Sequence, residues 1–249
     1  MLIQPTIENL KMLKLFGMVH ALESQMQVPD HKDLSFEDRL GLIVDTELTF
    51  RESKKTKSRL KTAKLAQAAL IEDLDVKGGR GIDKSTLASL ATSDWVRLNQ
   101  NVIISGATGV GKSYLACALT HKACRDGFTA QYERVSRLLE ELLLAKVDGR
   151  YNKLLADIRG KNVLVLDDFG LAPLTAENRR DLLEILEDRY DKGSTIITTQ
   201  LPVEHWHEVI GDPTIADAIL DRVVHNSHKI HLKGESRRKT KAKDLQLVS

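Results

Sequence analysis

Eight consecutive residues near the middle of the chain have the types and spacing of a phosphate-binding loop. Residues 106–113 read GATGVGKS, which matches the pattern G-x-x-x-x-G-K-[ST] at every fixed position. A β-branched apolar run at 102–104 precedes this loop, and an apolar helical pattern at 114–125 follows it. A chance glycine-rich turn would lack these flanks, because strand, turn and helix together are the context in which the pattern binds phosphate. The segment is therefore predicted to hold the phosphates of a nucleotide.

Each fixed position of the loop has a physical reason. Glycine lets the backbone turn its N–H groups toward an anion without a Cβ clash, and the helix N-terminus adds partial positive charge. Lys112 can reach the β- and γ-phosphates, and the Ser113 hydroxyl can ligate Mg²⁺. The predicted nucleotide contacts are Gly106, Ala107, Thr108, Gly109, Val110, Gly111, Lys112, Ser113 and Tyr114.

Two consecutive carboxylates follow an apolar run of strand length, NVLVL at 162–166. Alone, this pattern would equally describe a turn after a core strand. Beside a phosphate-binding loop, it predicts a buried parallel strand that delivers Asp167 and Asp168 at its C-terminal end. Asp167 would hold Mg²⁺ through water, and Asp168 would polarise the water that attacks the γ-phosphate of ATP. Gln200 follows the strand predicted at 194–199 and can reach the same water or the γ-phosphate.

Two arginine positions could also serve a nucleotide. Arg222 lies near the end of a helix predicted over 217–225, where a guanidinium can stabilise transition-state charge in a neighbouring subunit. An ordinary surface salt bridge fits the spacing of Arg222 equally well. Arg237 and Arg238 follow a last strand expected at 229–232, and an arginine there could reach the nucleotide of its own subunit.

The order of the expected elements predicts an α/β fold with a parallel sheet. The expected strands alternate with helices and lie at 102–104, 130–135, 162–166, 194–199 and 229–232. Residues 1–74 are expected to form a small all-helical domain, in which Ser35 and Asp38 cap a helix. Residues 75–249 are expected to form the second domain, because the glycine-rich stretch KGGRG at 77–81 reads as a connector.

Positive charge is concentrated in two stretches of the chain. The formal net charge is only +2, but residues 51–64 and 229–243 together carry +12 and the remainder carries −10. On a helix, four lysines of the first stretch would form one stripe and three further cations a second row. These predicted DNA contacts are Lys54, Lys57, Lys61, Lys64, Arg51, Lys55 and Arg59. A solvated surface helix is the alternative, but like charges at this density weaken an isolated helix and make most sense against phosphates.

Composition excludes several other classes of protein. Aromatic residues make up 4% of the chain, which disfavours nucleic-acid binding by base stacking. The two cysteines, Cys117 and Cys124, are seven residues apart on one predicted helix, so core packing in a reducing cytosol is expected. The opening residues lack a signal-peptide pattern, and no apolar run approaches the length of a membrane span. We therefore expect a cytoplasmic protein without a membrane partner.

Six segments together resemble the AAA+ family, and within it the IstB-like transposition helpers of bacterial insertion sequences. The segments are LKLFGMVHAL, SGATGVGKSYLACAL, VLVLDDFG, STIITTQLP, AILDRVVH and LKGESRRK. The resemblance covers nearly the whole chain and implies an AAA+ ATPase core with a five-stranded parallel sheet. It implies ATP bound between adjacent subunits, a multimer on duplex target DNA, and recruitment and stimulation of a transposase. ATP hydrolysis would then control disassembly.

The same resemblance implies roles for single residues. Gln200 lies where the family has its first sensor, Arg222 at the arginine finger, and Arg238 rather than Arg237 at the second sensor. The IstB-like helpers share a branch of the AAA+ family with the DnaC helicase loaders and the DnaA initiators. This branch carries an extra helix after the second strand, expected here within 136–157, which makes Lys146 and Arg150 candidates for the DNA-facing surface. Two residues depart from the family pattern. Asp168 stands where many members have glutamate, which predicts slow hydrolysis, and Gln200 stands where asparagine is usual.

Two other functions remain open at this point. A helicase loader of the DnaC type shares the core and would bind a replicative helicase and single-stranded DNA. A nucleotide-gated DNA scaffold would bind ATP with little turnover, which the shorter carboxylate of Asp168 allows.

Overall fold

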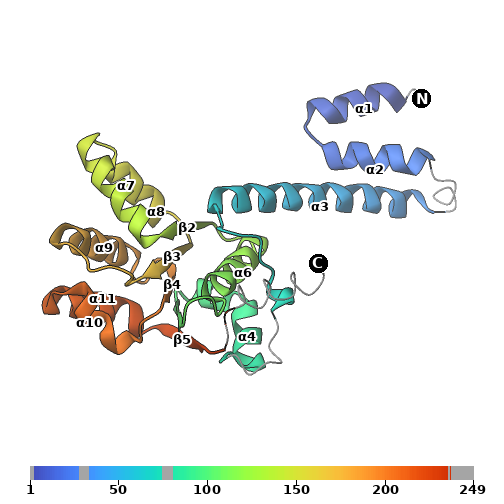
Figure 1. Ribbon diagram of the computed structural model, residues 1–249. Helices are drawn as coiled ribbons and strands as arrows, with labels where there is room; N and C mark the ends of the chain where they lie inside the picture. The colour runs from blue at the N-terminus through green and yellow to red at the C-terminus, as the bar shows by residue number, and fades with distance from the viewer. Residues whose placement is uncertain (1–2, 28–33, 75–80, 235, 237–249) are drawn as a thin grey trace, which may run out of the picture. The chain divides into compact units, whose positions relative to one another are not determined.

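The computed structural model describes residues 3–27, 34–74, 81–234 and 236 (Figure 1). Contacts between Cα atoms separate two compact units, Met1–Ser58 and Arg59–Ser249. The domain boundary predicted near residue 75 from the glycine-rich connector stays a prediction.

Helices form the described part of the N-terminal unit. α1 (Ile3–Met12) and α2 (Phe16–Gln27) precede the 28-residue α3 (Phe36–Ala63), which begins in this unit and ends in the next. Ser35 caps α3: its hydroxyl accepts a hydrogen bond from Asp38 N at 3.1 Å and donates one to Asp38 Oδ2 at 2.8 Å. The predicted capping pair is confirmed, and it satisfies an N–H group that the helix itself leaves unpaired.

α2 and α3 approach closely at Gly17. Glu47 of α3 is 4% exposed, and its carboxylate accepts the Met18 N–H at 3.0 Å and the Arg51 Nε–H at 2.7 Å. The hydrogen bond from Arg51 is the largest cause that holds the pKa of Glu47 below its usual value. A Cβ on Gly17 would lie 2.6 Å from Glu47 Cα, so this packing requires glycine.

A five-stranded parallel sheet forms the centre of the second unit. In space, the order of the strands is β2 (Ala130–Arg134), β3 (Val163–Phe169), β4 (Ser194–Thr199), β1 (Asn101–Gly106) and β5 (Ser227–Leu232). All neighbouring pairs in this sheet are parallel, so the carboxyl ends of the strands meet at one edge. The predicted α/β fold with a parallel sheet is confirmed.

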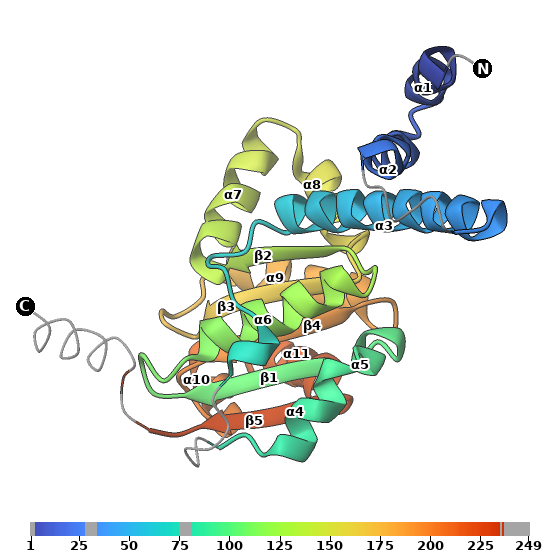
Figure 2. The ribbon, with the colours of Figure 1, turned by 90° about the vertical axis from the view of Figure 1, so that its right-hand side faces the viewer.

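Helices cover both faces of the sheet. Figure 2 shows α6 lying across one face. Val102 and Ile104 of β1 belong to the buried cluster on the α6 side, whereas Ile103 belongs to the cluster on the opposite side. This division follows from the alternation of side chains along a strand.

The remaining helices are short or of medium length. Those of the α6 side are α4 (Lys84–Ala91), α5 (Asp94–Arg97) and α6 (Lys112–Arg125). Those of the opposite side are α7 (Val135–Val147), α8 (Tyr151–Arg159), α9 (Ala176–Arg189), α10 (Trp206–Ile210) and α11 (Pro213–Val224). Among the described residues, Ile71–Asp73 and Val203–His205 form 3₁₀ helices. Across the part of the chain that the structure describes, none of the helices combines the length and apolar character needed to cross a membrane.

The end of β3 and the start of α11 differ from the sequence prediction. β3 continues to Phe169, three residues beyond the predicted end at Leu166, because a β-bulge accommodates the two aspartates within the strand. α11 begins at Pro213 rather than at residue 217. Asp212 caps this helix by accepting the Ile215 N–H at 3.0 Å, and proline is favoured at the first position of a helix.

Replacing Gly17 with alanine is expected to destabilise the N-terminal unit by about 1–3 kcal/mol, because the new Cβ must displace the α3 backbone. Gly41 is the matched control, since no atom beyond its helical neighbours lies within 4 Å of its Cβ position. Gly41→Ala is expected to stabilise α3 by about 0.5–1 kcal/mol. Urea unfolding followed by circular dichroism measures both variants. An unfolding midpoint of Gly17→Ala equal to that of the wild type would contradict the close packing of α2 on α3.

Candidate nucleotide-binding site

Three glycines of the loop have backbone angles that other residues rarely adopt. The φ angles of Gly106, Gly109 and Gly111 are +145°, +85° and +111°, and Gly111 directly precedes α6. A Cβ on Gly106 would lie 2.4 Å from Leu232 O, and one on Gly109 would lie 2.2 Å from Ser236 Oγ. The loop therefore needs glycine both for its conformation and for space. The N–H groups at the start of α6 make this turn suited to an anion.

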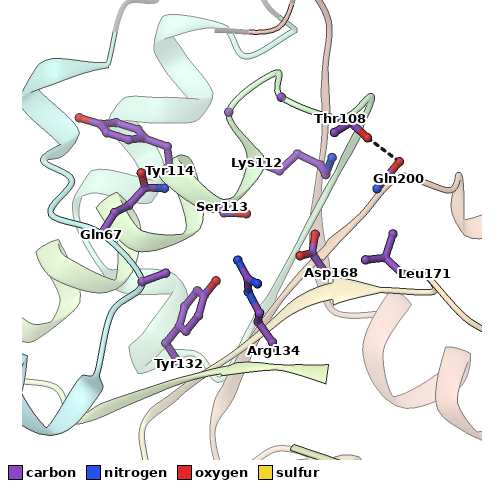
Figure 3. Close-up of a pocket in the computed structure, with 13 residues that line it drawn as sticks. Gln67, Thr108, Lys112, Ser113, Tyr114, Tyr132, Arg134, Asp168, Leu171 and Gln200 are labelled. Carbon is purple, nitrogen blue, oxygen red and sulfur yellow. Dashed lines mark hydrogen bonds between the residues drawn. The ribbon is translucent and has the colours of Figure 1, made fainter. Parts of the chain in front are cut away.

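Lys112 is the first residue of α6, and its side chain turns back along the loop (Figure 3). The residue is 6% exposed, and Nζ donates hydrogen bonds to Gly106 O at 2.8 Å and to Ala107 O at 2.9 Å. A buried ammonium group requires such acceptors, because burying an unpaired charge is costly. The loop carbonyls thus keep the positive charge at the predicted phosphate site.

Asp167 is held by hydroxyl groups from three different elements. It is 1% exposed. Oδ1 accepts hydrogen bonds from Ser113 Oγ at 2.8 Å and from Thr198 Oγ1 at 2.5 Å, and Oδ2 accepts one from Tyr132 Oη. Burial, and secondarily the bond to Asp167, raise the pKa of Tyr132 far above its usual value, so the phenol stays protonated and remains a donor.

The neighbouring oxygens of Ser113 and Asp167 fit a Mg²⁺ site. A hydroxyl and a carboxylate are the hard oxygen ligands that Mg²⁺ prefers, and the two side chains lie 2.8 Å apart (Ser113 Oγ to Asp167 Oδ1). These two residues would hold the ion, directly or through water, and the ion would neutralise phosphate charge. The structure therefore brings together the two metal-binding residues that the sequence predicted.

Asp168 faces the cavity because the strand is bulged at this point. The register between β3 and β4 shifts between Leu166 and Phe169, and Asp168 has a φ angle of +62°. Its N–H donates to Thr198 Oγ1 at 3.0 Å. In a regular strand, consecutive side chains point to opposite faces. Asp167 keeps to this alternation, since it points to the α6 side like Val163 and Val165. The register shift after it leaves Asp168 lining the cavity.

Gln200 directly follows β4, and its side chain is hydrogen-bonded to the phosphate-binding loop. Its Oε1 accepts a hydrogen bond from Thr108 Oγ1 at 2.8 Å (Figure 3). Gln200 and Asp168 line the same cavity, as predicted for two residues that act on one water molecule. A side-chain amide at this position can orient water or bind a phosphate oxygen, whereas it cannot act as a base at neutral pH.

The cavity has a volume of about 680 Å³, within the range of ligand sites in proteins. Its lining comes from the loop, from the ends of β2, β3 and β4, and from the chain segment after α3. The lining residues are Ala66, Gln67, Thr108, Gly109, Gly111, Lys112, Ser113, Tyr114, Tyr132, Arg134, Asp168, Leu171 and Gln200. Loop donors, the Ser113 hydroxyl and the Asp168 carboxylate thus surround one space, which is an arrangement suited to phosphoryl transfer to water.

The sequence analysis missed several side chains of this site. Tyr132 and Thr198 fix Asp167, and Arg134 and Gln67 line the cavity. A signal existed for the first three, because each lies at or near the carboxyl end of a predicted parallel strand, where functional residues gather. No local motif marks them, and their nearness to Asp167 depends on the order of strands in the sheet.

Arg222 lies at the opposite edge of the sheet from the loop of its own chain. Its backbone O accepts a hydrogen bond from Asn101 Nδ2 at 3.2 Å, and Asn101 is the first residue of β1. The loop starts at the other end of this strand, about 17 Å away at the usual rise per residue. The Arg222 guanidinium pairs with Glu187 at 2.6 Å (Nη2 to Oε1). Arg237 and Arg238 lie outside the described residues.

Several predicted DNA contacts take part in hydrogen bonds within the chain. On α3, Arg51 pairs with Glu47 at 2.7 Å and Lys55 with Glu52 at 2.8 Å. Further pairs are Arg150 with Asp148 at 2.6 Å, and Arg59 Nη1 with Cys124 O at 3.3 Å. The pairs of Lys55 and Arg150 are exposed on both sides and contribute little free energy, so phosphates can replace these partners. Glu47 is buried, so Arg51 is held more firmly than these two cations. Lys54, Lys57, Lys61 and Lys64 are exposed.

Lys146 is more firmly engaged than the other predicted DNA contacts. Its Nζ lies 2.6 Å from Asp181 Oδ1 and 2.8 Å from Glu177 Oε1, and the Asp181 side chain is 4% exposed. Tyr151 Oη also donates to Asp181 Oδ1 at 2.9 Å. Removing Lys146 would leave a buried carboxylate without its cation, which is strongly unfavourable. A DNA contact by Lys146 therefore stays a prediction that requires exchange of these partners.

Comparison with known sequences gives one consistent family. The family described as IstB-like ATP binding protein matches residues 8–244. An insertion sequence ATP-binding protein of Sinorhizobium fredii, y4pL, is 48% identical over 239 residues, covering 96% of this chain and 98% of that protein. An ATP-binding protein of insertion sequence IS1162 from Pseudomonas fluorescens is 47% identical, covering 81% of this chain and 88% of its own length. Its counterpart in IS21 of Pseudomonas aeruginosa is 34% identical, with coverages of 92% and 86%.

Several solved structures have the same fold. DnaI is 20% identical with a TM-score of 0.57, covering 71% of this chain and 94% of its own. The AMPPCP-bound DnaA from Aquifex aeolicus is 16% identical with a TM-score of 0.56, covering 74% and 56%. The DnaC helicase loader is 20% identical with a TM-score of 0.51, covering 70% and 99%. At these identities the likeness concerns the fold alone, which is the AAA+ fold.

Tyr132→Phe is expected to weaken Mg²⁺-dependent nucleotide binding about 10- to 100-fold, because the hydroxyl that fixes Asp167 is lost. Titration of Mg²⁺ against a fluorescent nucleotide measures the effect. Tyr190→Phe is the matched control, since Tyr190 is 48% exposed and does not line the cavity. An unchanged Mg²⁺ requirement in Tyr132→Phe would show that Asp167 does not depend on this hydroxyl.

Proposed function

The chain belongs to the family of IstB-like ATP-binding proteins, and from this premise we propose that it is an ATP-dependent DNA-binding regulator of transposition. It binds ATP with Mg²⁺ between adjacent copies of the chain and forms a multimer on duplex DNA. The multimer recruits and stimulates the transposase of the same element, and ATP hydrolysis controls its disassembly. The observation that carries the proposal is the convergence of Lys112, Ser113, Asp168 and Gln200 on one cavity.

ATP is the nucleotide that the observations favour. The loop offers a glycine backbone, a buried lysine and a Ser113–Asp167 pair suited to Mg²⁺. The relatives from insertion sequences carry ATP binding in their names, and the Aquifex aeolicus DnaA structure holds AMPPCP. These names describe the other proteins, and they support the same ligand for this chain.

Hydrolysis needs a group that prepares the attacking water. Asp168 is the carboxylate that lines the cavity, and Gln200 lies beside the loop through its bond to Thr108. Asp168 would accept the proton or polarise the water, while Gln200 would hold the water in place. A carboxylate one methylene shorter than glutamate reaches less far, which supports slow turnover that a partner or DNA accelerates.

The proposed dependence on a neighbouring subunit follows from the position of Arg222. Arg222 lies at the amino edge of the sheet, and this edge is too far from the phosphate-binding loop for the Arg222 side chain to reach a nucleotide bound by its own chain. In an assembly, Arg222 would exchange its pair with Glu187 for the terminal phosphate of the adjacent subunit's ATP. Each nucleotide site would then be complete only between two copies, so ATP binding favours assembly.

DNA binding is assigned to three exposed lysines in the last part of α3 and to Lys64, which follows the helix with a φ angle of +50° and so does not continue the predicted stripe. Lys54, Lys57, Lys61 and Lys64 provide charge without aromatic side chains among them, which fits the phosphate backbone and gives affinity without sequence readout. The insertion-sequence origin of the relatives supports a transposase as the protein partner.

Two alternatives differ in their partners. A helicase loader is supported only by the fold, since DnaC matches 70% of this chain at 20% identity. The insertion-sequence relative y4pL is 48% identical and covers 96% of the chain, which favours the transposition role. A nucleotide-gated scaffold that binds ATP but barely hydrolyses it differs only in turnover, and phosphate release with and without DNA separates the two.

We expect large assemblies on duplex DNA with ATP or a slowly hydrolysed analogue, and smaller species with ADP. Sedimentation and fluorescence anisotropy with duplex and single-stranded DNA measure size and affinity together. The double reversal Lys57→Glu and Lys61→Glu should weaken duplex binding by at least about tenfold, because each phosphate contact adds to affinity. Preference for single strands, or equal behaviour in ATP and ADP, would contradict the proposal.

The control for this charge reversal is the pair Lys84→Glu and Lys192→Glu. It changes the net charge equally at two exposed lysines away from α3. If both double variants lost the same affinity, general charge rather than the α3 lysines would account for binding.

Mixing two inactive variants tests the shared site. Asp168→Asn should retain ATP binding but lower hydrolysis about 100-fold or more, and Arg222→Ala should do the same through loss of the neighbour's cation. In mixed assemblies, an intact Asp168 can meet an intact Arg222 from the adjacent copy, so part of the activity should return. The measurement is DNA-stimulated phosphate release as a function of the mixing ratio.

The control for the mixing experiment is Glu187→Gln. It breaks the pair that holds Arg222 without removing the arginine, and it should keep activity near that of the wild type. Failure of the mixed variants to recover any activity, with assemblies of normal size, would show that Arg222 is a surface ion pair only.

A further inference from the structure

Arg134 is a cation in the cavity that neither the loop motif nor the carboxylate motif assigns. It is the last residue of β2 and directly precedes α7. Figure 3 shows its side chain rising from the strand between Tyr132 and Asp168, with the guanidinium directed toward Ser113. The residue is exposed, yet it lines the nucleotide cavity. Its charge is therefore available to a ligand from the side opposite the loop.

Tyr132 and the two aspartates are the neighbours of Arg134. Tyr132 is the largest cause that raises the pKa of the Arg134 guanidinium above its usual value, and the charges of Asp168 and Asp167 also raise it. Tyr132 donates a hydrogen bond to Asp167, so Arg134 lies beside the side chain that fixes the predicted metal ligand. A planar guanidinium at this position is suited to binding a phosphate oxygen.

Charge in the cavity is unevenly distributed. Among the lining side chains, Lys112 and Arg134 are the cations and Asp168 is the anion. Lys112 is bonded to loop carbonyls, whereas Arg134 lies beside Asp168 at the other side of the cavity (Figure 3). A triphosphate differs from a diphosphate by the negative charge of its terminal phosphate, and this phosphate must lie within reach of the carboxylate that prepares the water.

We propose that Arg134 contacts the terminal phosphate of the nucleoside triphosphate bound in its own subunit, and so makes the site favour triphosphate over diphosphate. This inference rests on the proposed nucleotide site and names a further binding residue within it. Arginine suits this task because its planar guanidinium can donate two parallel hydrogen bonds to one phosphate group. Arg134 and the neighbour's Arg222 would then approach the terminal phosphate from two different chains.

The test compares two affinities in one variant. Arg134→Ala is expected to weaken binding of the slowly hydrolysed analogue ATPγS about tenfold and binding of ADP less than twofold, with Mg²⁺ present in both cases. Arg134→Lys should recover part of the ATPγS affinity, since it restores the charge without the second parallel bond. Isothermal titration calorimetry on the full chain measures both constants without turnover.

Two comparison variants separate this role from a structural one. Arg137→Ala removes an exposed arginine of α7, three residues away and outside the cavity lining, and should leave both affinities unchanged. Tyr132→Phe should weaken both nucleotides, because it acts through Asp167 and Mg²⁺. Equal loss of ATPγS and ADP affinity in Arg134→Ala would overturn the inference and leave the nucleotide site intact. Absence of nucleotide binding by the wild type would instead overturn the proposed function.

Discussion

The buried carboxylate of Asp167 is the constraint on which the rest of the site depends. A charge that is 1% exposed is tolerated only when hydrogen bonds replace water, and three hydroxyls provide them. Ser113 belongs to α6, Tyr132 to β2 and Thr198 to β4, while Asp167 itself belongs to β3. These bonds tie the helix that carries the loop to three strands of the sheet. The loop is thereby held in register with the carboxylates that must act beside it.

A single irregularity in β3 gives two adjacent aspartates different surroundings, one in the core and one at the cavity. Asp167 follows the regular alternation of the strand into the hydroxyl network, and the register shift after it leaves Asp168 at the cavity with a φ angle of +62°. Thr198 serves both residues, because its Oγ1 accepts the Asp168 N–H and donates to Asp167. Aspartate tolerates the left-handed region better than most side chains, since its short carboxylate can bond locally. This gives a local physical reason for an aspartate at this position.

The residues of the proposed reaction lie at two opposite edges of the sheet, so under the proposed function they come from two subunits. The carboxyl edge carries the loop, Asp168, Gln200 and Arg134, so a single chain can bind the nucleotide. The amino edge carries Arg222, which remains paired with Glu187 while no neighbour is present. Under the proposed function, hydrolysis therefore waits for assembly, and assembly is sensitive to the state of the nucleotide. The proposed DNA contacts, the exposed lysines of α3, would connect the same assembly to DNA.

The sequence by itself determined the loop, the carboxylate strand and the alternation of strands and helices. Each of these is a local pattern: glycine positions set backbone angles, and apolar runs set buried strands. It also marked the Ser35–Asp38 cap, which the structure confirms. Only the tertiary structure decided which side chains from other parts of the chain lie near the loop and the aspartates. The order β2-β3-β4-β1-β5 places Tyr132 and Arg134 beside the aspartates. In the folded chain, Arg222 lies at the amino edge of the sheet, and Lys146 pairs with Asp181. Strand order and long-range pairing are set by which apolar faces pack together, and no spacing along the chain encodes that choice.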